Sequence, residues 1–249
     1  MKRRLLLNSN STMHGGKYLD HCEDDIKDLF LGRRRILFVP FALHDRAKYV
    51  HKVRERFADF GLEVESLHDR PDAQAAVGSA EGMFIGGGNT WRLLTSLYEL
   101  NVLSAIRSRV GEGMPYMGSS AGTGVACVTI KTTNDMPIVQ PPSFSALGLV
   151  PFNINAHYRD PDPGSTHMGE TREERIREFH EMNDPPVLGM REGAWLRVDD
   201  SSAILKGTTG ARLFRKGREP EEYCHGARLD FLLKEEGDRK GEEPSTVHE

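Results

Sequence analysis

Short apolar runs alternate with segments of helical periodicity through the first half of the chain. The apolar runs lie at 5–7, 36–41 and 82–85, and residues 62–67 alternate apolar and polar side chains as a strand does. Apolar residues recur at helical spacing in 18–31, 45–60, 72–80 and 91–100. Short apolar runs are typical of buried strands, and a recurrence every three to four residues is typical of helices. The alternation predicts a mostly parallel sheet covered by helices on both faces.

The second half of the chain contains more strands and turns. Residues 152–157 alternate apolar and polar side chains, which predicts a strand that ends at His157. A capping box, Thr171-Arg172-Glu173-Glu174, predicts a helix from 171 to about 182. Another buried strand is predicted at 187–190. Short apolar runs between glycine turns then predict a small antiparallel appendage, with strands at 196–198, 203–205 and 211–214.

The end of the chain differs in composition from the rest. Residues 234–249 are rich in charge and poor in apolar side chains. Such a segment cannot bury enough apolar surface to offset the entropy lost on ordering. We therefore expect a single α/β domain at 1–233, followed by a disordered tail.

Several polar or glycine-rich positions directly follow predicted strands. They are 8–10, 86–88, Ser120 and Glu192. In open α/β sheets, ligands bind outside the carboxyl ends of the strands. We therefore expect these positions to share one edge of the sheet and to form the functional site.

Gly118-Ser119-Ser120-Ala121-Gly122 fits the pattern G-x-S-x-G after a short apolar run. Between a strand and a helix, this pattern indicates a nucleophile elbow that exposes its central serine. Ser120 is therefore the candidate nucleophile. An ordinary strand-to-helix turn, with glycines for close packing, is the structural alternative.

Gly86-Gly87-Gly88-Asn89-Thr90 is the second informative stretch. Its N–H groups could converge on an anion, as a phosphate cradle or as part of an oxyanion hole. It lacks the spacing and the lysine of a P-loop. For a serine hydrolase, Gly88 and Ala121 could supply the two oxyanion donors. A plain glycine-rich turn is the remaining alternative.

A serine hydroxyl needs a base within hydrogen-bond reach, and the base needs an orienting partner. His157, at the end of a predicted strand, is the candidate base. Asp135 and Glu192 are the candidate partners, and the position of Glu192 after a buried strand favours it. The remaining carboxylate is free for another role, such as binding a substrate ammonium group.

Composition narrows the class of protein. The net charge is −4, and no stripe of Lys and Arg is interleaved with aromatic residues, so we expect no nucleic-acid partner. The three cysteines form no disulfide or metal-binding pattern, which fits a reducing, cytoplasmic location. Three apolar residues after the basic start are too few for a signal peptide, and no apolar stretch approaches 18 residues. We therefore expect no membrane association.

Five motifs in order resemble peptidase E, the α-aspartyl dipeptidase group of the serine peptidase family that includes cyanophycinase. They are Ile-Gly-Gly-Gly-Asn-Thr at 85–90, Gly-Ser-Ser-Ala-Gly at 118–122, Thr-Thr-Asn-Asp-Met-Pro at 132–137, Asn-Ala-His-Tyr at 155–158 and Gly-Glu-Thr-Arg-Glu at 169–173. The resemblance covers residues 3–233 approximately. It implies a three-layer α/β/α sandwich, related to the class I glutamine amidotransferase domain and to flavodoxin-like folds.

The resemblance also implies an activity, namely hydrolysis of dipeptides with an N-terminal aspartate, without metal or cofactor. A homodimer is a possible assembly. The resemblance implies that Ser120 is the nucleophile and His157 the base, with Asp135 or Glu192 as the acid. Gly88 and Ala121 occupy the positions of the oxyanion donors.

The substrate carboxylate requires a partner of its own. Arg172 lies in the matching Gly-Glu-Thr-Arg segment, and we assign it that role as a hypothesis, with Asn89 and Thr90 as hydrogen-bonding helpers. Two alternatives stay open, a hydrolase of β-aspartyl or cyanophycin-like substrates and a non-catalytic small-molecule-binding protein on the same fold. A glutamine amidotransferase is disfavoured, because its nucleophile would be cysteine.

Overall fold

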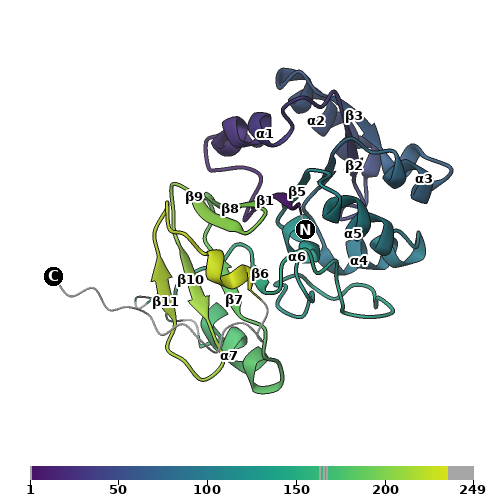
Figure 1. Cartoon of the computed structure of the whole chain (residues 1–249). Helices are drawn as coiled ribbons and strands as arrows, with labels where there is room; N and C mark the ends of the chain where they lie inside the picture. The colour runs from purple at the N-terminus through teal and green to yellow at the C-terminus, as the bar shows by residue number, and fades with distance from the viewer. Residues whose placement is uncertain (1, 163, 165, 167, 235–249) are drawn as a thin grey trace.

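The computed structural model of the protein describes residues 2–162, 164, 166 and 168–234. A seven-stranded sheet in the order β3-β2-β4-β5-β1-β8-β9 forms its centre (Figure 1). The first five strands in this order are mutually parallel, and β8 and β9 extend the sheet in antiparallel fashion. The bounds are β1 Arg4–Asn8, β2 Arg35–Val39, β3 Glu63–Ser66, β4 Met83–Ile85, β5 Tyr116–Ser119, β8 Ala194–Asp199 and β9 Ser202–Gly207.

Helices cover both faces of this sheet, because its central strands are apolar on both sides. Leu6 packs with helices α1 (Glu23–Leu29) and α2 (Arg46–Asp59). Its neighbours Leu5 and Leu7 point to the other face, which is covered by α3 (Ala73–Gly78), α4 (Thr90–Glu99), α5 (Leu103–Gly111) and α6 (Ala121–Ala126). This arrangement confirms the predicted α/β fold with a mostly parallel sheet between helical layers.

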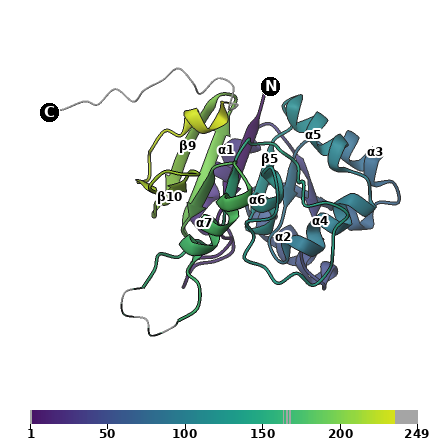
Figure 2. The same cartoon turned by 90° about the horizontal axis from the view of Figure 1, so that it is seen from below.

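A second sheet lies beside the first (Figure 2). Its order is β11-β10-β7-β6, with bounds β6 Asn153–Asn155, β7 Val187–Met190, β10 Ala211–Phe214 and β11 Glu221–Tyr223. Strands β6 and β7 are parallel, whereas β10 is antiparallel to β7 and to β11. Helix α7 (Arg172–Met182) packs on this sheet through Ile176 and Phe179, which contact Val187 and Phe214.

The late strands are antiparallel, as expected, but they do not form one separate unit. β8 and β9 complete the main sheet, and β10 joins β7. The apolar core reflects this, because one cluster runs continuously from Leu5 of β1 to Leu233. The expected charged tail lies outside the described residues from 235 onwards, so its disorder stays a prediction.

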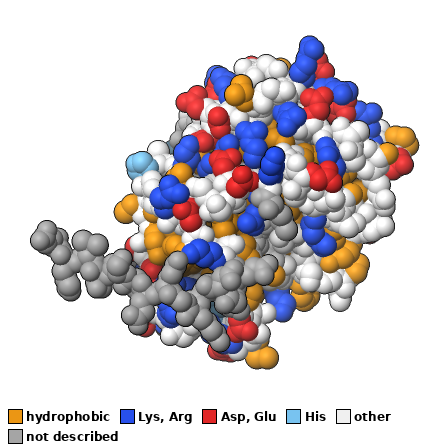
Figure 3. Space-filling view, viewed as in Figure 1, with side chains coloured by type: hydrophobic (Ala, Val, Ile, Leu, Met, Phe, Trp, Pro, Cys, Tyr) orange, Lys and Arg blue, Asp and Glu red, His pale blue; other side chains and the backbone are white. Residues whose placement is uncertain are grey.

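The surface carries charges of both signs. On the face shown in Figure 3, Lys and Arg side chains are interspersed with Asp and Glu. Within the described ranges, no helix has the length and apolar character needed to cross a membrane.

Candidate active site

Ser120 occupies a sharp turn between β5 and α6. Its backbone has φ 52° and ψ −107°, a conformation that L-residues rarely adopt and that is typical of strained functional positions. Two contacts hold the turn: the Ser120 N–H donates to the carbonyl of Asn8, 3.0 Å away, and Thr123 Oγ1 donates to the same oxygen. The glycine at 122 is a steric requirement, because a Cβ there would lie 1.9 Å from the carbonyl oxygen of Ile85.

A continuous chain of hydrogen bonds begins at the Ser120 hydroxyl. Its Oγ lies 2.9 Å from His157 Nε2, and His157 Nδ1 lies 2.7 Å from Glu192 Oε1. His157 and Glu192 each come two residues after β6 and β7, which are parallel neighbours in the second sheet. The three side chains therefore meet where the two sheets adjoin, with Ser120 provided by the first sheet.

Asp135 lies elsewhere in the same site. Its Oδ2 accepts hydrogen bonds from the N–H and the hydroxyl of Thr90, at 2.7 and 2.5 Å. Among the described residues, Oδ1 has no hydrogen-bond partner. Sequence left Asp135 and Glu192 open as partners of His157, and the structure brings Glu192 to Nδ1.

Asn89 and Thr90 support this loop. The Asn89 side chain caps α4 by accepting from Arg92 N–H and donates to the carbonyl of Met136, 2.8 Å away. Thr90 binds Asp135 and also lines the pocket beside Ser120. Their main contacts therefore hold Asp135 in place, and direct contact of either residue with a substrate stays a prediction.

The glycine loop runs alongside the serine. A Cβ on Gly87 would lie 3.1 Å from Ser120 Cβ, so the loop and the elbow are in close proximity. Gly88 has φ +134°, which orients the chain for the N–H of Asn89 to reach the carbonyl of Ala42. Within the described part of the chain, the N–H groups of Gly88 and Ala121 donate to no protein acceptor and are available to a ligand.

A small cavity of about 30 Å³ opens beside Ser120. Its lining combines apolar surface, such as that of Ile130 and Ile154, with the polar side chains of Thr90, Asp135 and His157. Its size suits a small polar group, and any larger part of a ligand would lie outside it.

Arg172, the first residue of α7, is half-buried. Among the described residues, no carboxylate forms an ion pair with it. Burial, together with the like charges of Arg175 and Arg159, lowers the pKa of Arg172, and the nearby charge of Asp135 opposes this shift. Arg172 does not line the cavity beside Ser120, but its charge interacts with that of Asp135, with which it forms no direct ion pair among the described residues.

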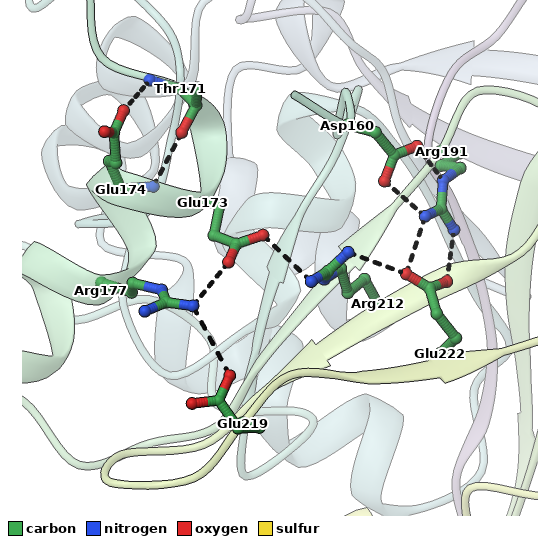
Figure 4. A network of polar contacts seen from close by, with 9 residues as sticks. All are labelled: Asp160, Thr171, Glu173, Glu174, Arg177, Arg191, Arg212, Glu219 and Glu222. Carbon is green, nitrogen blue, oxygen red and sulfur yellow. Dashed lines mark hydrogen bonds and ion pairs between the residues drawn. The ribbon is translucent and has the colours of Figure 1, made fainter. Parts of the chain in front are cut away.

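Two supporting residues received no specific role from sequence, although Ser9 lies in the 8–10 segment that was expected at the site. Ser9, which is fully buried after β1, accepts a hydrogen bond from the backbone N–H of His157 and donates to the carbonyl of Met190. Arg191, next to Glu192, forms bidentate ion pairs with Asp160 and Glu222 (Figure 4). The position of Ser9 directly after a buried strand was a usable signal, whereas nothing local pairs Arg191 with Asp160.

The same charged network continues to α7. Figure 4 shows Arg212 between Glu222 and Glu173, at 3.4 and 3.3 Å, and Glu173 is the neighbour of Arg172. Glu173 also pairs with Arg177, 2.7 Å away. The ends of β7, β10 and α7 are therefore tied together next to the site.

Comparisons with known proteins agree with this geometry. The model of peptidase family S51 matches residues 5–206. Peptidase E of Streptomyces coelicolor is 53% identical over 94% of this chain and 96% of its own length. A probable alpha-aspartyl dipeptidase of Drosophila melanogaster is 51% identical over 93% of this chain and 98% of its own.

A solved structure shows the same fold. It is that of a peptidase from an acI-B1 actinobacterium, with a TM-score of 0.71 and 17% identity, covering 92% of this chain and 97% of that one. The resemblance carried by the five sequence motifs is confirmed by the family match and by the two relatives, whereas the solved structure supports the fold. Together, the family match and the close relatives show that the chain belongs to peptidase family S51.

Proposed function

We propose that the protein is a serine dipeptidase that hydrolyses dipeptides with an N-terminal aspartate. The observation that carries the proposal is the hydrogen-bonded chain Ser120–His157–Glu192, at 2.9 and 2.7 Å. Beside it, the N–H groups of Gly88 and Ala121 donate to no acceptor among the described residues. A nucleophile, a base and an orienting acid in this order are the parts that acyl transfer requires. The name of the Drosophila relative, alpha-aspartyl dipeptidase, supports the substrate class.

In the first half of the reaction, Ser120 Oγ attacks the carbonyl carbon of the peptide bond while His157 Nε2 takes the hydroxyl proton. Glu192 accepts the Nδ1–H bond and stabilises the imidazolium that forms. The N–H groups of Gly88 and Ala121 receive the negative charge on the carbonyl oxygen. His157 then gives the proton to the leaving amine, and the aspartyl group remains on Ser120 as an ester.

In the second half, water replaces the leaving amino acid. His157 Nε2 removes a proton from the water, whose oxygen attacks the ester carbon. The same N–H groups stabilise the second tetrahedral intermediate. Its collapse breaks the ester bond, returns the proton to Ser120 Oγ and releases free aspartate.

Two charges in the site match the charges of an N-terminal aspartate. Arg172, with no ion pair among the described residues, can bind the β-carboxylate through two parallel N–H bonds. The unpaired Oδ1 of Asp135 can accept from the α-ammonium group. A substrate that lacks either charge would leave one of these partly buried groups unsatisfied, which is an effective basis for discrimination.

The test is a comparison of kcat/KM for Asp-Leu, Asn-Leu, Glu-Leu, Ala-Leu and the β-linked isomer of Asp-Leu. Ser120→Ala serves as the control for contaminating peptidases, and all assays are repeated with a chelator. We expect chelator-resistant cleavage of Asp-Leu that is absent in Ser120→Ala. Preference for the β-linked isomer would shift the assignment to β-aspartyl substrates.

Lack of turnover on every substrate would favour a binding protein instead. Persistent activity in Ser120→Ala would refute the serine mechanism. The possible homodimer remains a separate prediction, which sedimentation equilibrium at micromolar concentration would test.

A further inference from the structure

The His157–Glu192 pair depends on two segments that are far apart in the chain. Residues 157–160 follow β6, and residues 190–192 comprise the last residue of β7 and the two residues after it. His157 has φ +55°, a costly conformation for a non-glycine residue that persists only where the surroundings fix it. Three sets of contacts join the two segments, and we call this set the 157–160 clamp.

The first contact of the clamp is the hydroxyl of Ser9. It accepts from His157 N–H at 2.9 Å and donates to the carbonyl of Met190 at 2.8 Å, so both of its hydrogen-bonding functions are used. Ser9 follows β1 in the first sheet, whereas its two partners flank the ends of β6 and β7 in the second. This hydroxyl therefore fixes the position of His157 relative to the sheet that carries Ser120.

The second contact is made by Tyr158. Its N–H also donates to the Met190 carbonyl, 3.0 Å away, and its buried ring packs against Gly189. A Cβ on Gly189 would lie 2.7 Å from the ring, so Tyr158 is in direct steric contact with β7 at the residue before the 190–192 segment.

The third contact is the ion pair of Arg191 with Asp160. Arg191 Nε and Nη2 donate to the two carboxylate oxygens at 2.7 and 2.6 Å, a bidentate arrangement that fixes orientation as well as distance (Figure 4). Glu222 of β11 binds Arg191 Nη1 and Nη2 at 3.0 and 3.1 Å and so fixes the guanidinium from the other side. The Arg191 guanidinium also lowers the pKa of Asp160, which keeps this carboxylate charged.

We infer that Ser9 and Arg191 are positioning residues that set the distance from His157 to Ser120 and to Glu192 during turnover. This inference rests on the proposed function. Neither side chain hydrogen-bonds to any of the three reacting residues' side chains within the described structure, so both act through the backbone of 157–160 and 190–192. A displacement of about 1 Å at a reacting group can cost about 10²-fold in rate.

The experiment compares Ser9→Ala and Arg191→Met with matched controls. Ser66→Ala removes another buried serine hydroxyl, which accepts a hydrogen bond from the backbone N–H of His68. Ser66 ends β3, the strand at the far edge of the main sheet. Arg56→Met breaks an equally dense ion-pair cluster, with Asp20 and Glu23, away from the site. We expect the two clamp variants to lower kcat for Asp-Leu by about 10- to 100-fold with KM within about threefold, and the controls to stay within about twofold of wild type.

A second measurement does not depend on activity. The proton on His157 Nδ1, in its 2.7 Å hydrogen bond to Glu192, should give a strongly downfield NMR resonance in the wild type and in Ser120→Ala. We expect this resonance to broaden or shift in Ser9→Ala and Arg191→Met and to persist in both controls. Wild-type kcat together with an unchanged resonance in either clamp variant would remove that residue from the positioning role.

Milder variants cover the case in which Arg191→Met fails to fold. Arg191→Lys keeps the charge but loses the bidentate geometry, and Asp160→Asn keeps the side-chain shape. Each should fall between wild type and Arg191→Met, and adding Asp160→Asn to Arg191→Met should cause little further loss, because one interaction is already broken. If the losses of kcat in Arg191→Met and Asp160→Asn add up in the double variant, the two residues do not act through one interaction. The proposed function and the clamp can fail separately. If the wild type shows no activity on any substrate, but its downfield resonance is present and is lost in the clamp variants, the proposed function is refuted and the clamp is retained.

Discussion

The clearest test of substrate recognition is the replacement of Arg172 by methionine, which keeps the apolar stem and removes the charge. In the proposed complex the guanidinium makes two charge-assisted hydrogen bonds to the substrate carboxylate, each worth about 1.5–3 kcal/mol in proteins. Arg172 is only half-buried, so we take about 2–4 kcal/mol for the pair after allowing for solvent screening. At about 1.4 kcal/mol per factor of ten, kcat/KM for Asp-Leu should fall by about 30- to 1000-fold.

The assay is the ratio of kcat/KM for Asp-Leu to that for Asn-Leu, measured in wild type and variant. Asn-Leu lacks the carboxylate charge, so its turnover should change little and the ratio should collapse. Arg175→Met is the matched control, because Arg175 lies one turn further along α7, is exposed and pairs with Glu170. Thermal unfolding should be unaffected in Arg172→Met, since no ion pair among the described residues is lost. An unchanged ratio would refute the reasoning and remove Arg172 from the substrate site.

Three further predictions concern the triad, the glycine loop and pH. Glu192→Gln should lower kcat about 10²-fold in steady-state assays, because a half-exposed carboxylate 2.7 Å from His157 Nδ1 stabilises the imidazolium by about 2–3 kcal/mol. An unchanged kcat would favour Asp135 as the acid instead. Gly88→Ala should destabilise the protein by about 1–3 kcal/mol in denaturant titrations and lower kcat about 10²-fold or more, because φ is +134° and the Cβ would lie 2.6 Å from the Ala42 carbonyl. Gly78→Ala is the control, because its Cβ would meet nothing within 4 Å, and it should change neither kcat nor the free energy of unfolding. Burial lowers the pKa of His180 below its ordinary 6.5, so the folded state binds fewer protons than the unfolded state, and stability present above pH 6.5 is lost as the pH falls through the folded-state pKa. His180→Gln should flatten the pH dependence of the unfolding free energy between about pH 7 and 5. An unchanged slope would contradict the assignment to His180.

Local sequence patterns predicted most of the main sheet, because its strands are apolar on both faces and its helices are amphipathic. The N-caps illustrate this: Asp45, Asp72 and Thr171 each accept a backbone N–H at the helix starts that the sequence indicated. Helix α5 was missed, although Leu103, Ile106 and Val110 have helical spacing and all three are buried. It follows α4 after a short turn, and no strand separates the two helices to mark the boundary.

The second sheet could not be predicted from local patterns. Strand β11 is Glu221–Tyr223, three polar or amphipathic residues that carry no strand signal, and its existence depends on pairing with β10. The position of Glu192 after a buried strand favoured it over Asp135, but local patterns could not decide between the two carboxylates. The choice is decided by the parallel pairing of β6 with β7, which places two loops from distant parts of the chain side by side. Asp160 and Arg191 were unassigned for the same reason, because their pairing also depends on the neighbouring ends of β6 and β7.

The central place of β1 has a consequence for the synthesis of the protein. Residues 5–8 pair with 116–119 on one side, and residues 4–8 pair with 195–199 on the other. This strand therefore has no partner on its second edge until almost four-fifths of the chain has been translated. Pairings across such separations close slowly and leave an apolar segment accessible in the meantime. The Ser120 turn also depends on β1 through the Asn8 carbonyl. A nascent chain therefore carries the serine, the histidine and the first strand before β8 is available to pair with β1, and we expect peptide hydrolysis only after β8 has been synthesised.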